Sequence, residues 1–224
     1  LREVVNVVFK LGLIALAATL GLSSQGLGLW PVQWHPVLQL IPALIIFDFF
    51  EYWYHRASHR HRFLWRFHAI HHSPKRLYFF NAARFHFVDW IVLSIIEVAI
   101  LFAMGADPKV IALAVVFIQV HGLFQHANID LKLGLLNYVV SGPELHRWHH
   151  SKVIQESDTN FGNNVIVWDI VFGTWFLPKD KTVGVLGLMN PDYPTSFRGQ
   201  LAAAFAATPL DKPADYYEKQ SNAD

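Results

Sequence analysis

The chain has 224 residues, enough for one sizeable domain and too few for two of ordinary size. Hydrophobic residues make up 53% of it and charged residues only 16%, against about 25% charged in an average soluble domain. The formal net charge of +1 gives no basis for binding nucleic acid, and the lack of cysteine excludes disulfides, thiolate zinc sites and an iron–sulfur cluster held by this chain. We therefore expect a single membrane-embedded domain, 1–224. Because the chain begins at Leu1 and not at methionine, we also expect further residues before it in the full protein, and no signal peptide can be read at its start.

Four apolar segments could cross a bilayer, for which about 20 mostly apolar residues are needed. They are residues 4–22, 37–54, 87–104 and 110–126. Lys10 interrupts the first segment, and its amine could extend to the interface. The third and fourth segments are joined by a short stretch that contains Gly105 and Pro108, which predicts a helical hairpin. The alternative, a soluble protein with four buried helices, is disfavoured by the length of the segments.

The basic residues lie on one side of these segments. Between the second and third segments stand Arg56, Arg60, Arg62, Arg66, Lys75, Arg76 and Arg84, and after the fourth stand Lys132, Arg147 and Lys152. The opposite side has little besides Lys109. By the positive-inside rule, the basic stretches face the cytoplasm. We therefore predict an all-α, multi-pass membrane protein with four transmembrane helices in two hairpins, and a cytoplasmic helical cap made of residues 55–86 and 127–224.

The 13 histidines are the most unusual feature of the composition. Most of them fall into four clusters beside the ends of apolar segments: His55 and His59; His68, His71 and His72; His121 and His126; and His146, His149 and His150. Residues three or four apart on a helix share a face, so each cluster can direct imidazoles at one point. Imidazole binds iron, zinc, copper and nickel. Ten imidazoles exceed the needs of one ion, so we predict two ions in one pocket, at the usual spacing of about 3.5–4 Å.

The third cluster departs from this spacing. His121 and His126 are five residues apart, so they diverge by about 140° on a regular helix. Gln125 occupies the position that would share a face with His121. Either the helix deforms here or only one of the two histidines binds a metal directly.

Taken together, the motifs resemble those of the membrane-bound fatty acid hydroxylase and sterol desaturase superfamily. The similar stretch covers about residues 45 to 177. Its parts are Asp48–His59, Leu64–Ser73, Ala83–His86, Phe124–Asn128, His146–Ser151, Thr159–Asn163 and Trp168–Thr174. The order of the histidine motifs is specific to that superfamily.

The resemblance implies a cytoplasmic site with two iron ions that activates O2 to hydroxylate or desaturate a lipid. It implies as ligands His55, His59, His68, His71, His72, His146, His149 and His150. In the third cluster it favours His126 over His121, because the segment around Gln125 and Asn128 resembles that of the superfamily. An all-imidazole shell does not select strongly for ferrous iron, so zinc could occupy the site in purified protein.

Several polar residues could support the ligands. Acidic groups in apolar spans are costly and tend to be functional. Asp48 and Glu51 lie one or two turns before His55, so each could accept a hydrogen bond from the second ring nitrogen of a ligand. Hydration at the interface is the alternative for both. Further candidates for this supporting role are His86, Gln125, Asn163 and Asp169.

The reaction would need electrons from another protein, because the chain has no dinucleotide-binding motif, no haem-attachment motif and no cysteine. The basic loops suit an acidic ferredoxin, rubredoxin or cytochrome, although loops that only fix the topology would look the same. One alternative function is a zinc-dependent membrane lipid hydrolase. The chain lacks the His-Glu-x-x-His arrangement that such an enzyme would be expected to have. Another is a membrane metal-binding or transport protein, which the position of the histidines at one face disfavours. The sequence leaves open the lipid and the choice between hydroxylation and desaturation.

Overall fold

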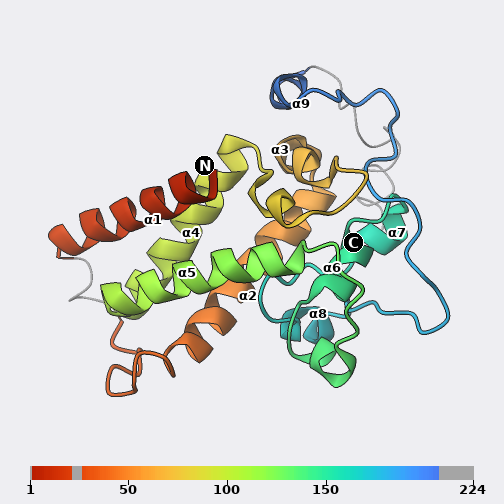
Figure 1. The fold of residues 1–224 in the computed structure, drawn as a ribbon. Helices are drawn as coiled ribbons and strands as arrows, with labels where there is room; N and C mark the ends of the chain where they lie inside the picture. Colours follow the sequence, from red (N-terminus) through yellow and green to blue (C-terminus); the bar gives the residue numbers. More distant parts are fainter. Residues whose placement is uncertain (1, 22–26, 207–224) are drawn as a thin grey trace.

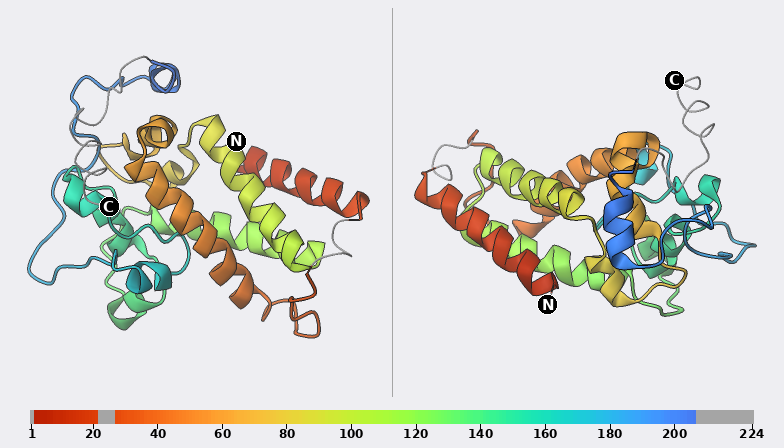
Figure 2. Two further views of the ribbon diagram at one scale, coloured as in Figure 1. Left: turned by 180° about the vertical axis from the view of Figure 1, so that it is seen from behind. Right: turned by 90° about the horizontal axis from the view of Figure 1, so that it is seen from above.

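The structure is a computed structural model that describes residues 2–21 and 27–206, and the elements in those ranges are all helical. Four long helices gather on one side of the molecule: α1 (Arg2–Thr19), α2 (Leu40–Arg60), α4 (Phe87–Met104) and α5 (Pro108–Gln125). The shorter helices lie towards the other side (Figures 1 and 2): α3 (Arg62–His72), η2 (Phe79–Ala83), η3 (Gly134–Tyr138), α6 (Pro143–His149), α7 (Ile154–Ser157), α8 (Val167–Val171) and α9 (Phe197–Ala203). In the described ranges, extended segments pair only at isolated bridges, Val140 with Val165 and Ser151 with Leu186.

The turn between α4 and α5 follows from its residues. Gly105 ends α4 with a φ of 91°, in the left-handed region that glycine tolerates and other residues avoid. Asp107 then caps α5 by accepting a hydrogen bond from the backbone nitrogen of Lys109, and Pro108 occupies the first helical position, where no backbone donor is needed. The two helices therefore follow each other after a very short turn, as the sequence predicts.

Two of the predicted spans are supported by helix length and composition. Helices α4 and α5, each of 18 residues, are long and apolar enough to cross a membrane. Large apolar side chains on the long helices are open to the surroundings, among them Val8 (61%), Leu16 (56%), Ile41 (57%) and Val120 (60%). Apolar surface of this extent is unusual on a soluble monomer and is expected where helices face lipid.

The other two predicted spans meet the length and composition criteria less well. The apolar part of α1, Val4–Thr19, is shorter than a full span, and the predicted end at residue 22 lies outside the described residues. Helix α2 begins at Leu40 and not at residue 37. It is long enough, but Asp48, Glu51 and Arg56 lower its hydropathy. The structure thus gives two candidate spans and two further long helices packed against them.

The long helices share an apolar core at the end away from the histidines. It includes Ala43 of α2, Leu101 of α4, and Ile111 and Ala114 of α5, all fully buried. Small side chains such as alanine allow helices in a membrane to approach closely. This packing fixes the direction of α2 and α5, and their opposite ends deliver histidines to the cap.

Candidate metal centre

Nine histidines from four helices converge where the long helices meet the cap. The last turns of α2 carry His55 and His59, α3 ends at His72, His126 follows α5 directly, and α6 ends at His149. One ring nitrogen from each histidine of a group lies within 4.8 Å of the others, so these helix ends meet at one place in the fold. The site is therefore assembled at helix ends by tertiary packing.

The ring nitrogens form two separate groups. In each group, one nitrogen per residue lies within 4.8 Å of the corresponding nitrogens of all the others. The five-histidine group consists of His55, His59, His68, His72 and His149, and the four-histidine group consists of His71, His126, His146 and His150. The groups are neighbours, because the rings of His72 and His150 stack with their centroids 4.5 Å apart.

The two His-x-x-His-His motifs each contribute to both groups. The outer pair of the first motif, His68 and His72, are four residues apart and join the five-histidine group, while His71 joins the other. The second motif has the reverse assignment: His146 and His150 join the four-histidine group, and His149 joins the five-histidine group. Residues at positions i and i+4 share a helix face, and the residue directly before the last one points about 100° away. The spacing thus explains how one short helix can serve two ions.

The distances between nitrogens fit a metal site. The closest Nε2–Nε2 distances are 2.9 Å (His55–His149), 3.1 Å (His59–His72), 3.2 Å (His68–His72), 3.2 Å (His71–His126), 2.8 Å (His126–His146) and 3.0 Å (His146–His150). Two imidazole nitrogens bound at about 2.1 Å and at right angles to each other would be about 3.0 Å apart. The observed spacing matches adjacent positions around one ion.

The hydrogen bonds of the outward nitrogens leave the inward nitrogens free to bind a cation. The Nδ1 of His55 donates to the carbonyl oxygen of Phe161 and that of His149 to Thr159, each at 2.8 Å. A carbonyl oxygen only accepts, so the proton of each neutral ring lies on Nδ1 and both Nε2 atoms carry lone pairs. These lone pairs face each other at 2.9 Å. A metal ion between them converts this repulsion into coordination.

Burial keeps these rings neutral and therefore able to bind metal. Loss of hydration lowers the pKa of His71, His146 and His150 well below its usual value, and neighbouring imidazoles lower it further. The pKa of His72 and His149 is lowered in the same way. Neutral imidazole is the form that ligates a metal.

Two carboxylates that the sequence reasoning missed orient members of the five-histidine group. Asp89 of α4, which is fully buried, accepts from Nδ1 of His68 at 2.9 Å and from the hydroxyl of Tyr54 at 2.5 Å. Asp158 accepts from Nδ1 of His59 at 3.0 Å. A carboxylate behind a ligating imidazole fixes its orientation and raises its basicity. Asp89 could have been suspected as an acid at the start of an apolar span.

The segment Thr159–Asn163 forms the wall behind His55 and His149, and Asp169 holds it. Asp169 accepts from the backbone nitrogens of Phe161 at 2.8 Å and Gly162 at 2.7 Å. Burial raises the pKa of Asp169 to about 6. Only glycine fits at position 162, because a Cβ there would lie 2.4 Å from the carbonyl oxygen of Val165. The predicted supporting role of Asp169 is thus exerted through the backbone of this segment.

The structure places the other predicted supporting residues around the same wall. Asp48 contacts no histidine; it accepts from the backbone nitrogens of Asn164 at 2.8 Å and Val165, and so ties α2 to the wall. Gln125 donates to the carbonyl oxygens of Gly162 at 3.1 Å and Asn163 at 2.9 Å. The side chain of Asn163 hydrogen-bonds with Glu51.

Two of the predicted histidines lie elsewhere. The Nε2 of His121 is 3.0 Å from the carbonyl oxygen of Ser141, and His121 belongs to neither group. His121 points away from the groups because it diverges from His126 by about 140° on a regular helix. Helix α5 stays regular to Gln125, and His126, the next residue, reaches the four-histidine group. His86 is buried and caps α4 by accepting from the backbone nitrogen of Val88 at 3.2 Å.

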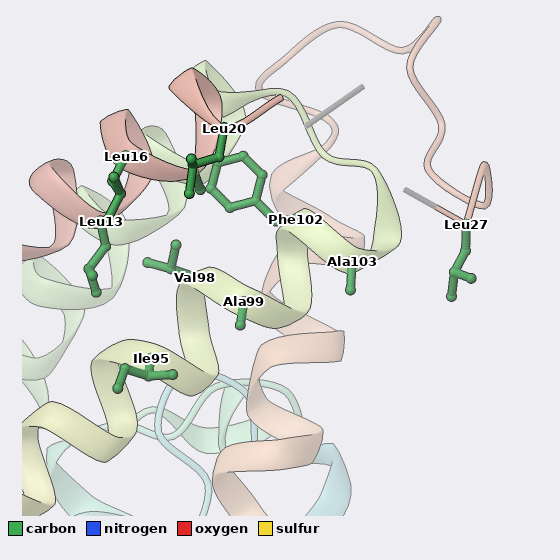
Figure 3. A pocket seen from close by; sticks show the side chains of 10 residues that line it. Leu13, Leu16, Leu20, Leu27, Ile95, Val98, Ala99, Phe102 and Ala103 are labelled. Atoms are coloured by element: carbon green, nitrogen blue, oxygen red, sulfur yellow. The ribbon is translucent and has the colours of Figure 1, made fainter. Parts of the chain in front are cut away.

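A small cavity of about 30 Å³ adjoins both groups. Its wall includes His55 and His68 from one group and His71, His126 and His146 from the other. Glu51, Phe85 and Phe161 also line it, so the space beside the histidines is mostly enclosed by ring faces with one carboxylate. A larger hollow of about 570 Å³ lies between α1 and α4 and is lined by apolar side chains (Figure 3), but it shares no residue with the histidine groups.

Comparisons with known proteins agree with the histidine motifs. A family model described as fatty acid hydroxylase matches residues 40–174. Ornithine lipid hydroxylase OlsE of Rhizobium tropici is 38% identical over 180 residues, which cover 79% of this chain and 53% of that relative. Human (Homo sapiens) alkylglycerol monooxygenase is 28% identical over 167 residues, covering 73% and 36%, and sphinganine C4-monooxygenase 1 of Arabidopsis thaliana is 27% identical over 141 residues, covering 61% and 54%.

The chain spans about half the length, or less, of these relatives, and no solved structure matches it. The family match covers more than half of this chain and includes every histidine of both groups. It confirms the resemblance inferred from the sequence. The chain belongs to the fatty acid hydroxylase family.

Proposed function

We propose that this chain is a membrane lipid hydroxylase that uses two iron ions, one in each histidine group, to insert an oxygen atom into a C–H bond. The convergence of nine imidazoles into two adjacent groups, beside a small cavity, is the observation that carries the proposal. The relatives, whose names describe action on ornithine lipids, alkylglycerols and sphinganine, support a lipid substrate.

Iron bound to these groups would supply the redox chemistry with O2. In the overall reaction a C–H bond of the lipid is broken and a C–O bond is formed. The second oxygen atom leaves as water, with two electrons and two protons from outside. The protein's part is to hold the histidines rigidly and to keep bulk water from the cavity, which Phe85 and Phe161 help to enclose.

We propose that α1 and α2 cross the membrane together with α4 and α5, giving four spans with the cap on the cytoplasmic side. The exposed apolar side chains of α1 and α2 support this arrangement. Lys10 of α1 and Asp48 of α2 do not oppose it, since Lys10 pairs with Glu97 and Asp48 accepts several hydrogen bonds. Charges inside a membrane are tolerated when they are paired within the bundle.

We infer that the two electrons come from a separate carrier protein, of the ferredoxin, rubredoxin or cytochrome kind. A hollow of about 650 Å³ on the cap supports a docking place near the histidines. Lys132, Arg147, Lys179 and Lys181 line it together with Asp130 and Glu144, which pair with Lys132, so that basic side chains outnumber acidic ones by two. An acidic carrier would be attracted to such a surface.

A zinc-dependent lipid hydrolase is the second candidate. The sequence argument against it is the lack of a His-Glu-x-x-His arrangement, yet Glu51 lines the cavity beside both groups and could act as a base. The names of the relatives favour oxidation.

Loading the purified protein with either metal distinguishes the two functions. With Fe(II), a reductant and isotopically labelled O2, we expect a lipid product that contains one labelled oxygen, and none with zinc, which has no redox chemistry. The His149→Ala variant is the negative control. If the zinc protein turns lipid over without a reductant and the iron protein does not, the hydroxylase proposal is wrong.

A further inference from the structure

A second cavity, of about 70 Å³, lies among the long helices beside the histidines. We call it the polar chamber. It shares Glu51, Phe85 and His126 with the wall of the metal cavity, so the two spaces adjoin. On its other side it shares Asn6 and Trp90 with a hollow of about 230 Å³.

That hollow connects the chamber with the surroundings. It lies between α1, η2 and α4, and its rim includes Val5 (50% exposed) and Phe87 (48% exposed). Ala82 and Ala83 of η2 leave it open, because larger side chains there would fill it. The hollow, the polar chamber and the metal cavity thus adjoin one another in that order, from the outside of the bundle to the histidines.

The chamber carries an excess of hydrogen-bond acceptors. Glu97 of α4 is fully buried and is ion-paired with Lys10 through Oε2, while its Oε1 has no hydrogen-bond partner. The Oε2 of Glu51 is also buried and without a partner. A buried carboxylate oxygen that lacks a donor is costly, more so in a helix bundle among lipids, where water is scarce.

The remaining polar side chains of the wall satisfy one another. Asn6 donates to the side-chain oxygen of Gln119 at 2.9 Å and accepts from the indole nitrogen of Trp90. With both carboxylates ionised, as an entering cation would favour, they and the one ammonium carry one net negative charge. Its chemical complement is a cation with N–H donors.

We propose that the polar chamber binds the ammonium group of a lipid head group, with Glu51 and Glu97 as its acceptors and the acyl chain passing out through the hollow. This inference rests on the proposed lipid hydroxylation, for which it names the substrate class. The chamber and the metal cavity together are far smaller than the roughly 300–1,000 Å³ of pockets that enclose a whole drug-sized ligand. A compact head group fits them, whereas a sterol ring system does not.

The test measures binding and not turnover. Zinc-loaded protein in nanodiscs is titrated with three lipids of equal chain length: an N-acyl diaminopropane (ammonium), an N-acyl aminopropanol (hydroxyl) and an N-acyl β-alanine (carboxylate). Displacement of a fluorescent lipid gives each Kd. We expect the ammonium lipid to bind about tenfold more tightly than the hydroxyl lipid, because a hydrogen bond to a charged partner is roughly twice as strong as a neutral one.

Two variants and a control assign the preference to the chamber. Glu51→Gln and the double variant Lys10→Met/Glu97→Gln each remove one negative carboxylate, and the double variant leaves no unpaired lysine. Each should bring the ammonium and hydroxyl lipids to within about twofold of each other, chiefly by raising the Kd of the ammonium lipid. Glu156→Gln, in the cap, removes a carboxylate that accepts from Ser151 and should change nothing.

The inference is overturned if the wild-type protein binds the ammonium lipid no more tightly than the hydroxyl lipid. It is also overturned if the chamber variants weaken the binding of all three lipids equally, which would indicate that Glu51 and Glu97 have a structural role. If the ammonium preference is found but the iron-loaded protein oxidises none of the lipids, the chamber stands and the proposed function fails.

Discussion

Replacing Asp89 should lower the metal affinity of one histidine group and not of the other. Asp89 is fully buried and accepts from Nδ1 of His68, a member of the five-histidine group. Its hydrogen bonds from Tyr54 and His68 do not involve the four-histidine group. Asp89→Asn keeps one acceptor oxygen and removes the charge, and Asp89→Ala removes both. The two variants should therefore weaken the binding of one ion and leave the binding of the other unchanged.

The size of the effect follows from the role of such carboxylates. Loss of the group behind a ligating imidazole typically lowers metal affinity by about 10–100-fold, or about 1.4–2.7 kcal/mol. We expect Asp89→Asn near the lower figure, because the amide oxygen can still accept from His68. Asp89→Ala should be near the upper figure, since Nδ1 of His68 and the hydroxyl of Tyr54 both lose their acceptor.

A chelator titration of zinc-loaded protein measures this loss of metal affinity. Metal per chain is determined by mass spectrometry as the chelator concentration rises. The wild-type curve is compared with that of each variant and of Asp107→Asn, which caps α5 at the end away from the histidines. One of the two ions should leave at about 10–100-fold lower chelator concentration in the Asp89 variants. Equal weakening of both ions, or no change in Asp89→Ala, would show that the groups do not bind metal independently as described.

Further predictions concern the ligands, the wall and the topology. His72→Ala and His146→Ala should each abolish turnover and lower metal content while the protein stays in the membrane; unchanged metal content would remove either residue from its group. Gly162→Ala should lower both the Tm and the metal content, because the added Cβ would meet the Val165 carbonyl at 2.4 Å, whereas Gly184→Ala, where a Cβ meets nothing within 4 Å, should do neither. A reporter inserted at Asp107 should be found outside the cytoplasm and one at Lys179 inside it; a cytoplasmic reporter at Asp107 would mean that α4 and α5 do not cross the membrane.

The sequence was informative about the histidines because their chemistry depends on local spacing. Pairs four residues apart, such as His68 with His72, are brought to one face by any helix. The sequence also anticipated the short turn at Gly105 and the all-helical fold. It could not show which member of each triplet serves which group, because that depends on how α3 and α6 pack against each other.

The supporting carboxylates were assigned less well, because they meet the histidines through tertiary contacts. Asp158 is far from His59 in the sequence, and nothing local links the two. Asp48 was the nearer candidate, only two turns before His55, yet its position on α2 directs it at Asn164 and Val165. Proximity in sequence predicted a contact with a ligand, and the packing of the cap decided otherwise.

The two groups differ in a way that suggests a division of labour between the ions. Two carboxylates, Asp89 and Asp158, lie behind the five-histidine group. Behind the four-histidine group, His126 donates to the carbonyl oxygen of Gly122, and the Nδ1 atoms of His71, His146 and His150 have no hydrogen-bond partner. Fewer ligands leave more coordination positions open, and weaker support lowers the basicity of those ligands. Most of the four-histidine group also lines the cavity. We therefore expect the ion of the five-histidine group to be held more tightly and that of the four-histidine group to be the more exposed to incoming ligands.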